Sequence, residues 1–77
     1  MNKPRRKELA KVVEALEEAM AALEQIKDEE QEAYDNMPEG IQESERGEQM
    51  SEYIDTMDEQ YSYLEDMIDA LNEIVEG

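Results

Sequence analysis

The sequence predicts an all-α protein: an antiparallel two-helix hairpin that pairs with a second copy into a homodimeric four-helix bundle. Three observations predict this fold. Two long segments carry apolar residues at helical spacing, residues that cap helices bound each segment, and a short connection with Pro and Gly separates them. The 77 residues form one domain and include neither Cys nor His. Disulfides and thiol or imidazole metal sites are therefore excluded as stabilising elements, and oligomerisation is the remaining common one.

The first helix is expected over about residues 4–36. If Leu9 is position a of a heptad, all eight a, d and e positions that follow are apolar. They are Leu9, Val12, Val13, Leu16, Ala19, Met20, Leu23 and Ile26. Pro4 suits the first turn of a helix, and Asn2 is a suitable cap before it. The helix should end before Pro38, because the residue that precedes a proline is disfavoured in the helical conformation.

A short turn over residues 37–43 leads to a second helix, expected over about residues 44–75. Ser44 supplies an oxygen that can cap this helix, and Glu45 and Glu48 place negative charge in its first turns, where it is favourable. The same heptad, started at Met50, is apolar at every a, d and e position except Gln60. The apolar residues are Met50, Tyr53, Ile54, Met57, Tyr61, Leu64, Met67, Ile68, Leu71, Ile74 and Val75.

The width of these stripes predicts self-association. Three apolar positions in every seven are typical of a helix that packs against several neighbours. Because the connection is short, the helices should fold back on each other, and a lone hairpin then leaves part of each stripe in water. A twofold dimer covers that remainder. The residues expected in its shared core are Leu16, Leu23, Met57, Tyr61, Leu64, Ile68 and Leu71.

Negative charge is concentrated in the second part of the chain. Residues 28–77 carry eighteen acidic side chains and one basic one, residues 1–27 carry five acidic and six basic ones, and the net charge is −16. We expect no direct binding of nucleic acid, because this charge repels phosphate. Four basic residues near the start are expected to form intramolecular clamps beside Glu73 and Glu76, with a nucleic-acid-binding cluster as the alternative. They are Lys3, Arg5, Arg6 and Lys7.

Several residues on the stripes have two interpretations. Lys27 and Glu30 interrupt the first stripe, where the helix either faces solvent or forms a polar layer. In the second case Glu30 would bond to the hydroxyl of Tyr53, or to Gln60 of a second copy. Gly47 is expected to allow close helix approach near the turn. The methionines on the stripes serve as core filler or as an adaptable binding surface; they are Met20, Met37, Met50, Met57 and Met67.

The acidic outer side of the second helix is the candidate binding surface. Its residues are Glu48, Glu52, Asp55, Asp58, Glu59, Tyr63 and Asp66. Tyr63 lies one residue off the apolar lattice among carboxylates, where it either anchors a partner or covers the flank of the stripe. Rows of carboxylates at helical spacing can imitate phosphates, so the expected partner is a basic protein, above all one that binds nucleic acid.

The composition argues against several functional classes. Without His, the usual base that activates a Ser nucleophile is missing, so we expect no enzymatic activity. No di-iron motif, EF-hand spacing or glycine-rich phosphate loop is present, so we expect no cofactor and no metal site. The longest apolar run, residues 19–23, is too short to span a membrane, and the start of the chain does not resemble a secretory signal. We therefore expect a cytoplasmic protein.

One segment carries a resemblance. Residues 28–42, DEEQEAYDNMPEGIQ, followed by SERGE at residues 44–48, resemble a segment of small acidic helical proteins from Gram-positive bacteria and their phages. The likeness covers about residues 25–75 and specifies no reaction. It implies a phage or mobile-element accessory protein that occupies a host protein's site, as an inhibitor, nucleic-acid mimic or anti-defence protein. The alternatives are a self-assembling structural bundle without a partner for its acidic surface, and a small-ligand pocket between helices.

Overall fold

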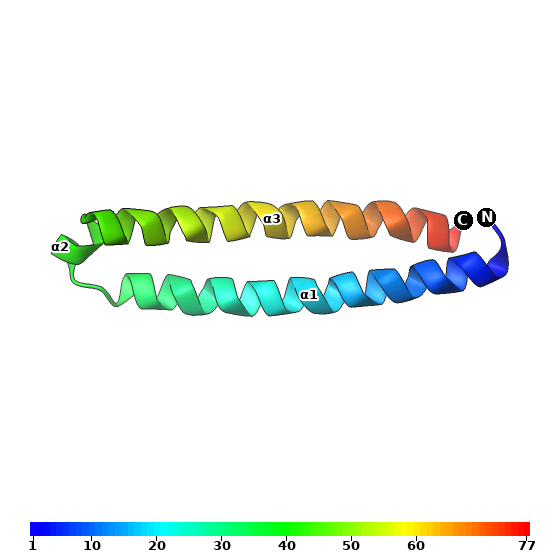
Figure 1. Cartoon of the computed structure of the whole chain (residues 1–77), viewed down its shortest axis with the longest axis horizontal. Coiled ribbons are helices and arrows are strands. Elements are labelled where there is room, and N and C mark those ends of the chain that lie inside the picture. The colour runs from blue at the N-terminus through cyan, green and yellow to red at the C-terminus, as the bar shows by residue number, and fades with distance from the viewer.

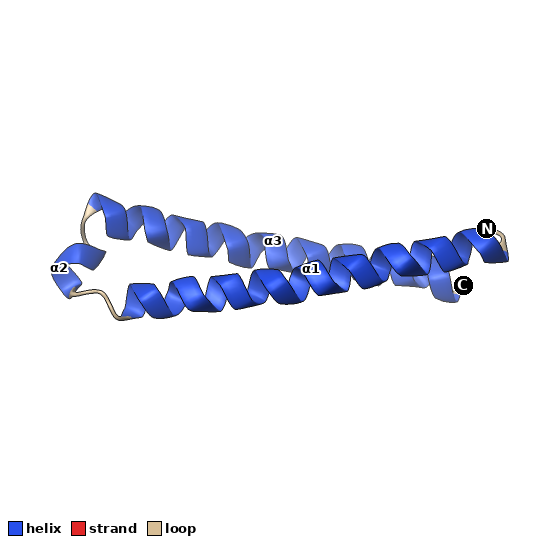
Figure 2. Cartoon of the chain, turned by 60° about the horizontal axis from the view of Figure 1, so that its bottom comes forward, coloured by secondary structure: helices blue, strands red, loops and turns tan.

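The computed structural model describes all 77 residues and contains three helices and no strand. The helices are α1 (Lys3–Asp35), α2 (Glu39–Gln42) and α3 (Glu45–Glu76). Figure 1 shows α1 and α3 running antiparallel, with both chain ends at one end of the molecule and α2 at the other. Figure 2 shows that the rest of the chain consists of short loops. The predicted all-α helical hairpin is confirmed.

Capping residues in the sequence fix the starts of both long helices. Asn2 is the N-cap of α1, and its Oδ1 accepts a hydrogen bond from the Arg5 N–H at 2.9 Å. Ser44 is the N-cap of α3, and its Oγ accepts a hydrogen bond from the Gly47 N–H at 3.4 Å. Each cap satisfies a backbone donor that a helix start leaves free, a contribution of about 1 kcal/mol. The observed bounds of both helices lie within one residue of the predicted ones.

Residues 37–43, expected as a turn, contain the one-turn helix α2. The Pro38 carbonyl accepts hydrogen bonds from the N–H groups of Ile41 and Gln42 at 2.9 and 3.0 Å. The side-chain amide of Gln42 then donates to the carbonyl of Tyr34 at 2.8 Å, near the end of α1. α2 therefore closes the hairpin by bonding to α1 on one side and leading directly into α3 on the other.

α2 packs against the first turn of α3 at Gly47, which is buried. A Cβ added to Gly47 would press on the backbone carbonyls of Ile41 and Gln42, with the Gln42 carbonyl carbon 2.5 Å away. The expectation that Gly47 allows close approach near the turn is confirmed, and the approaching element is α2.

Gly47→Ala is expected to lower the free energy of unfolding by about 1–3 kcal/mol, because a clash with backbone outweighs the roughly 1 kcal/mol by which alanine favours a helix. Gly40 is the matched control, since nothing lies within 4 Å of a Cβ added there. Gly40→Ala should leave stability unchanged or raise it. Urea unfolding followed by circular dichroism measures both variants. Equal stability of Gly47→Ala and the parent chain would contradict the close approach of α2 to Gly47.

The interface between α1 and α3, here called the seam, uses the a and e positions of the two heptads. Its three buried side chains are Val13, Ile54 and Ile68, with exposed fractions of 5%, 7% and 7%, and all three occupy e positions. Half-buried residues at a positions lie beside them, among them Leu9, Leu16, Leu23, Met57, Leu64 and Leu71. Apart from Gly47, no other residue is buried, so the hairpin has a thin core.

The molecule is long and exposes a large surface for its mass. Its Cα atoms extend over 58 × 14 × 13 Å. The accessible area is 5869 Å², whereas a compact folded protein of 9.0 kDa exposes about 4,900 Å². Roughly 1,000 Å² is therefore exposed that compact packing at this mass would cover.

The basic residues at the start of α1 do not form the predicted clamps with the end of α3. The only ion pair in the structure lies elsewhere, between Lys27 and Asp58. Figure 1 shows the reason, because the first turn of α1 extends past the last turn of α3. Three of the four basic residues line a shallow depression there, which is formed by Lys3, Arg6, Lys7, Ala10 and Val75. The prediction of intramolecular clamps is therefore wrong.

Candidate interaction surfaces

The hairpin has two broad faces of different chemistry. Because α1 and α3 are antiparallel and both turn their a and e positions inward, their d and g positions emerge on one face and their b and f positions on the other. We call the first the apolar face. Its apolar residues are Val12, Ala15, Ala19, Ala22, Ile26 and Ala33 from α1, and Tyr53, Tyr63, Met67, Ala70 and Ile74 from α3. All eleven are exposed.

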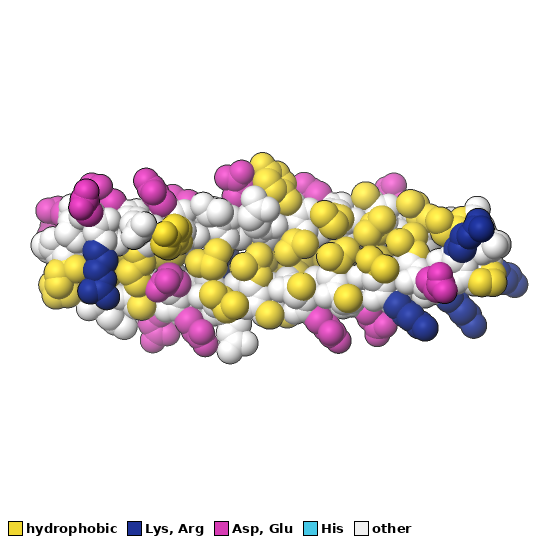
Figure 3. Space-filling model, in the orientation of Figure 1, with side chains coloured by type: hydrophobic (Ala, Val, Ile, Leu, Met, Phe, Trp, Pro, Cys, Tyr) yellow, Lys and Arg dark blue, Asp and Glu magenta, His cyan; other side chains and the backbone are white.

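Figure 3 shows the apolar face as a band of yellow side chains along both helices, from the end that holds the chain termini to beyond mid-length. Its six larger side chains are between 42% and 55% exposed. Single exposed apolar residues are ordinary on protein surfaces, but a continuous band along two helices indicates an interaction surface.

The residues predicted for the dimer core lie in or beside the seam. Ile68 is buried and the other six are half-buried: Leu16, Leu23, Met57, Tyr61, Leu64 and Leu71. The five at a positions border the apolar face, whereas Tyr61 and Ile68 lie on the other side of the seam. A second copy on the apolar face would therefore meet the a positions together with d positions that the prediction had not assigned to the dimer.

The residues predicted to bind a basic partner are all exposed on α3. Six carboxylates lie at b, c and f positions, away from the apolar face; we call them the acidic surface, Glu48, Glu52, Asp55, Asp58, Glu59 and Asp66. Tyr63, at a g position, borders the apolar face instead. Its hydroxyl donates to Glu59 Oε1 at 3.0 Å, and this hydrogen bond raises the pKa of Tyr63 above 10.0. Tyr63 therefore joins the edge of the apolar face to the acidic surface.

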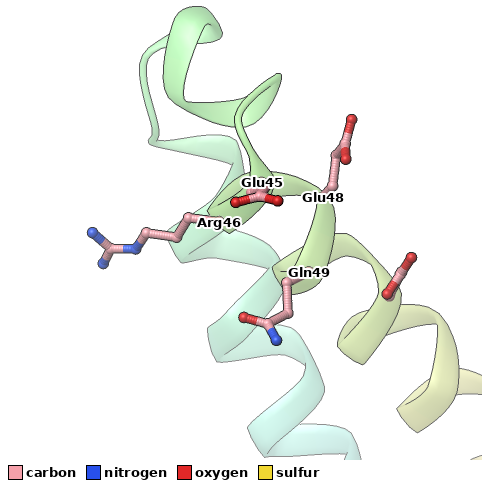
Figure 4. A pocket seen from close by; sticks show the side chains of 5 residues that line it. Glu45, Arg46, Glu48 and Gln49 are labelled. Carbon is pink, nitrogen blue, oxygen red and sulfur yellow. The ribbon is translucent and has the colours of Figure 1, made fainter.

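A shallow depression near the turn is lined by Glu45, Arg46, Glu48, Gln49 and Glu52. Figure 4 shows these side chains spread apart, with Arg46 and Glu48 pointing in opposite directions. No apolar side chain lines the depression, whereas small-molecule sites are lined mainly by apolar groups. Its carboxylates therefore extend the acidic surface toward the turn, and Arg46 is the one cation there.

A polar cluster joins α1 to α3 on the side of the seam opposite the apolar face. Lys27 Nζ donates to Asp58 Oδ1 at 3.0 Å and lies 5.4 Å from the centre of the Tyr61 ring. The Tyr61 hydroxyl donates to Glu24 Oε2 at 2.8 Å. Because the Asp58 side chain remains 67% exposed, its ion pair with Lys27 orients the helices more than it stabilises them. A polar layer thus exists at Lys27.

Glu30, the other interruption of the first stripe, is not part of that layer. It lies in a shallow depression with Arg46, Gln49, Met50 and Tyr53, and its side chain forms no hydrogen bond with Tyr53. Within one chain, the predicted bond between Glu30 and Tyr53 is therefore absent.

Both hydrogen bonds of the polar cluster favour protonated groups. The bond to Asp58 raises the pKa of Lys27 above 10.5, and the bond to Glu24 raises the pKa of Tyr61 above 10.0. A group whose pKa is higher in the folded state stabilises the fold below its unfolded pKa and loses that effect as the pH rises through the folded value. The stabilisation from Tyr61 should therefore be complete below pH 10.0 and disappear above it, and that from Lys27 above 10.5.

Glu24→Ala is expected to lower the pKa of Tyr61 toward 10.0, because it removes the acceptor that holds the phenol protonated. Glu17→Ala is the control, since Glu17 lies one heptad earlier and no tyrosine bonds to it. Tyrosine ring shifts in an NMR titration report the pKa directly. An unchanged Tyr61 titration in Glu24→Ala would contradict the bond across the seam.

These features define a class: an all-helical hairpin with one apolar broad face and an acidic surface outside it. A scan against protein-family models, a search of curated proteins and a search of solved structures each gave no match. None of the helices combines the length and apolar character that crossing a bilayer requires. No three acidic side chains are grouped so that they could hold a metal ion.

Proposed function

We propose that this chain is a non-enzymatic interaction module that acts as a homodimer and occupies a basic surface of a host protein through its acidic surface. The observation that carries the proposal is the lack of compensation on α3. Of the six carboxylates of the acidic surface, only Asp58 has a cationic partner. The other five are exposed and form no ion pair within the chain, so their charge is available to a basic protein.

The spacing of these carboxylates supports mimicry of a nucleic acid. Glu48, Glu52, Asp55 and Glu59 follow one another at intervals of four, three and four residues, and Asp66 extends the row. At ~1.5 Å of rise per residue, neighbouring charges in the first part of this row are ~4.5–6 Å apart along a straight helix. A rigid row of negative charge attracts surfaces that bind phosphates and raises the rate of association with them.

The resemblance of residues 28–48 to small acidic proteins of Gram-positive bacteria and their phages supports an accessory role. In that role the chain blocks a host protein that binds nucleic acid. Proteins of antiviral defence are among the host proteins of this kind. The apolar face favours a second candidate function, a bundle whose only partner is another copy of itself.

Affinity capture from host lysate, at low and at high salt, separates the two functions. An acidic mimic should retain a basic protein at low salt and release it as the ionic strength rises, because salt screens exposed charges. Nucleic acid added to the washed complex should displace the captured protein. Capture that is equally strong at both salt concentrations would exclude charge mimicry as the driving interaction.

A further inference from the structure

We propose that a second copy of this chain covers the apolar face and lies end for end on the first, so that each turn lies over the open end of the other copy. The inference rests on the self-association included in the proposed function. It specifies which face pairs and in which orientation.

The charges on the two broad faces indicate which face binds the second copy. Over α1 and α3, the b and f positions carry eleven carboxylates, whereas the d and g positions carry only two, Glu8 and Glu29. Two copies joined through the b and f positions would bury this negative charge against itself. Two copies joined through the apolar face place the same charge on the outside.

The apolar face is also large enough for a stable dimer. The whole hairpin extends over 58 by 14 Å, so each broad face has a footprint of about 800 Å², and two faces in full contact would bury about 1,600 Å², the size of a standard protein interface. The roughly 1,000 Å² by which the hairpin exceeds the area of a compact protein of its mass agrees with a surface that a partner covers.

The charge along the hairpin selects the orientation. The half near the turn, residues 20–60, has two basic and fourteen acidic side chains, net −12, while the remaining residues have five basic and nine acidic ones, net −4. If the two copies had their turns at the same end, a half with a net charge of −12 would lie against another half with a net charge of −12. In the end-for-end arrangement a half with a net charge of −12 lies against a half with a net charge of −4 at both ends, and this lowers the electrostatic repulsion between the copies.

In this orientation the basic start of α1 lies over the acidic turn of the second copy. Arg5 then approaches the carboxylates of Glu39 and Glu43 from that copy. The charge at this end, which finds no partner on α3 of its own chain, is compensated between copies.

Residue sizes agree with the end-for-end arrangement. The bonds from Lys27 to Asp58 and from Tyr61 to Glu24 fix the register of the hairpin, which places Ala19 near Met67 and Ile26 near Gln60. A twofold axis that passes midway between Ala19 and Ile26 along the hairpin packs α1 against α1 of the second copy. Ala19 then meets Ile26, so a small residue lies against a large one and close packing is possible.

The high net charge does not prevent this dimer, because the acidic b and f positions face outward. The two outer surfaces of a four-helix bundle are about 20 Å apart, given interaxial distances of 8–10 Å and the width of a helix. Exposed charges at that separation are largely screened, since the Debye length is about 8 Å at physiological ionic strength.

Two matched variants test the face. Ala19 and Ala21 are both exposed on α1, but Ala19 lies on the apolar face and Ala21 at an f position. Ala19→Glu is expected to weaken the dimer roughly 100-fold or more, because it buries an unpaired carboxylate at the interface. Ala21→Glu adds the same charge and should leave the dimer intact. Sedimentation equilibrium measures both, and the reverse result or a monomeric parent chain would overturn the proposal.

One labelled chain tests the orientation without depending on the folding of a core variant. The sequence has no Cys, so Gly40→Cys gives a single site for a spin label on α2, where an added side chain has free space. Pulsed electron–electron double resonance should give a distance of about 50 Å between the two spin labels of the dimer, which is the length of one long helix. A distance of about 20 Å would show turns at the same end and overturn the orientation. Neither measurement uses the basic partner, so a failure of this face or orientation is distinguishable from a failure of partner binding by the acidic surface.

Discussion

Neutralising four carboxylates of the acidic surface is expected to weaken capture of the basic partner strongly while the fold remains intact. The variant is Glu52→Gln, Asp55→Asn, Glu59→Gln and Asp66→Asn, and it leaves Asp58 in its ion pair with Lys27. Each of the four side chains is exposed on α3, so its replacement alters no buried contact. We expect the affinity to fall by roughly tenfold or more, mostly through slower association, with a weaker dependence on salt. Surface plasmon resonance with the captured protein measures both quantities.

The control variant removes the same number of charges from α1: Glu14→Gln, Glu17→Gln, Glu18→Gln and Asp28→Asn. These residues are also exposed, and none of their side chains forms an ion pair. If net charge alone attracts the partner, both variants will weaken binding equally. If the row on α3 is the binding surface, only the first variant will do so. Unchanged binding by the α3 variant would mean that the partner does not bind through the acidic surface.

Ile68→Ala is expected to unfold most of the chain at temperatures that the parent chain tolerates. Ile68 is only 7% exposed and is one of three buried side chains in the seam. An Ile→Ala change in a core costs about 2–5 kcal/mol, while a domain of this length has a total stability of roughly 4–12 kcal/mol. Thermal melting followed by circular dichroism should therefore show a large decrease in the melting temperature.

Ile41→Ala makes the same chemical change at an exposed position, since Ile41 in α2 is 42% exposed. It should shift the melting temperature much less, because little apolar surface is buried there. Similar melting temperatures for the two variants would mean that the seam is not the source of stability.

The bounds of the long helices could be predicted closely from the sequence because the signals that start them are local. The Asn2 and Ser44 side chains bond to amides three residues further along, so the chain alone reveals them. α2 was not predicted because its contacts are longer in range: Gln42 bonds to Tyr34, and the corner depends on the lack of a side chain at Gly47. Heptads also indicate the apolar side of each helix, but they do not fix the axial register of two helices. The displacement of α1 past the end of α3 therefore could not be predicted, and the clamps depended on it.

The candidate surfaces were predictable to different degrees. The acidic surface follows from composition, because carboxylates off the stripes are almost always exposed. The apolar face could not be predicted from the heptad pattern. The a, d and e positions are all apolar, and nothing in the sequence alone shows which two of these three positions the hairpin buries. Val13 and Val12 illustrate this, because they are neighbours of identical type with exposed fractions of 5% and 49%.

The thin seam between α1 and α3 also affects how the protein responds to its own abundance. The hairpin has only three buried side chains, and in the proposed dimer the second copy completes its hydrophobic core. Folding and association are then linked by mass action, so the melting temperature rises with protein concentration. The proposed dimer is therefore expected to be cleaved by proteases more readily at low expression than at high expression.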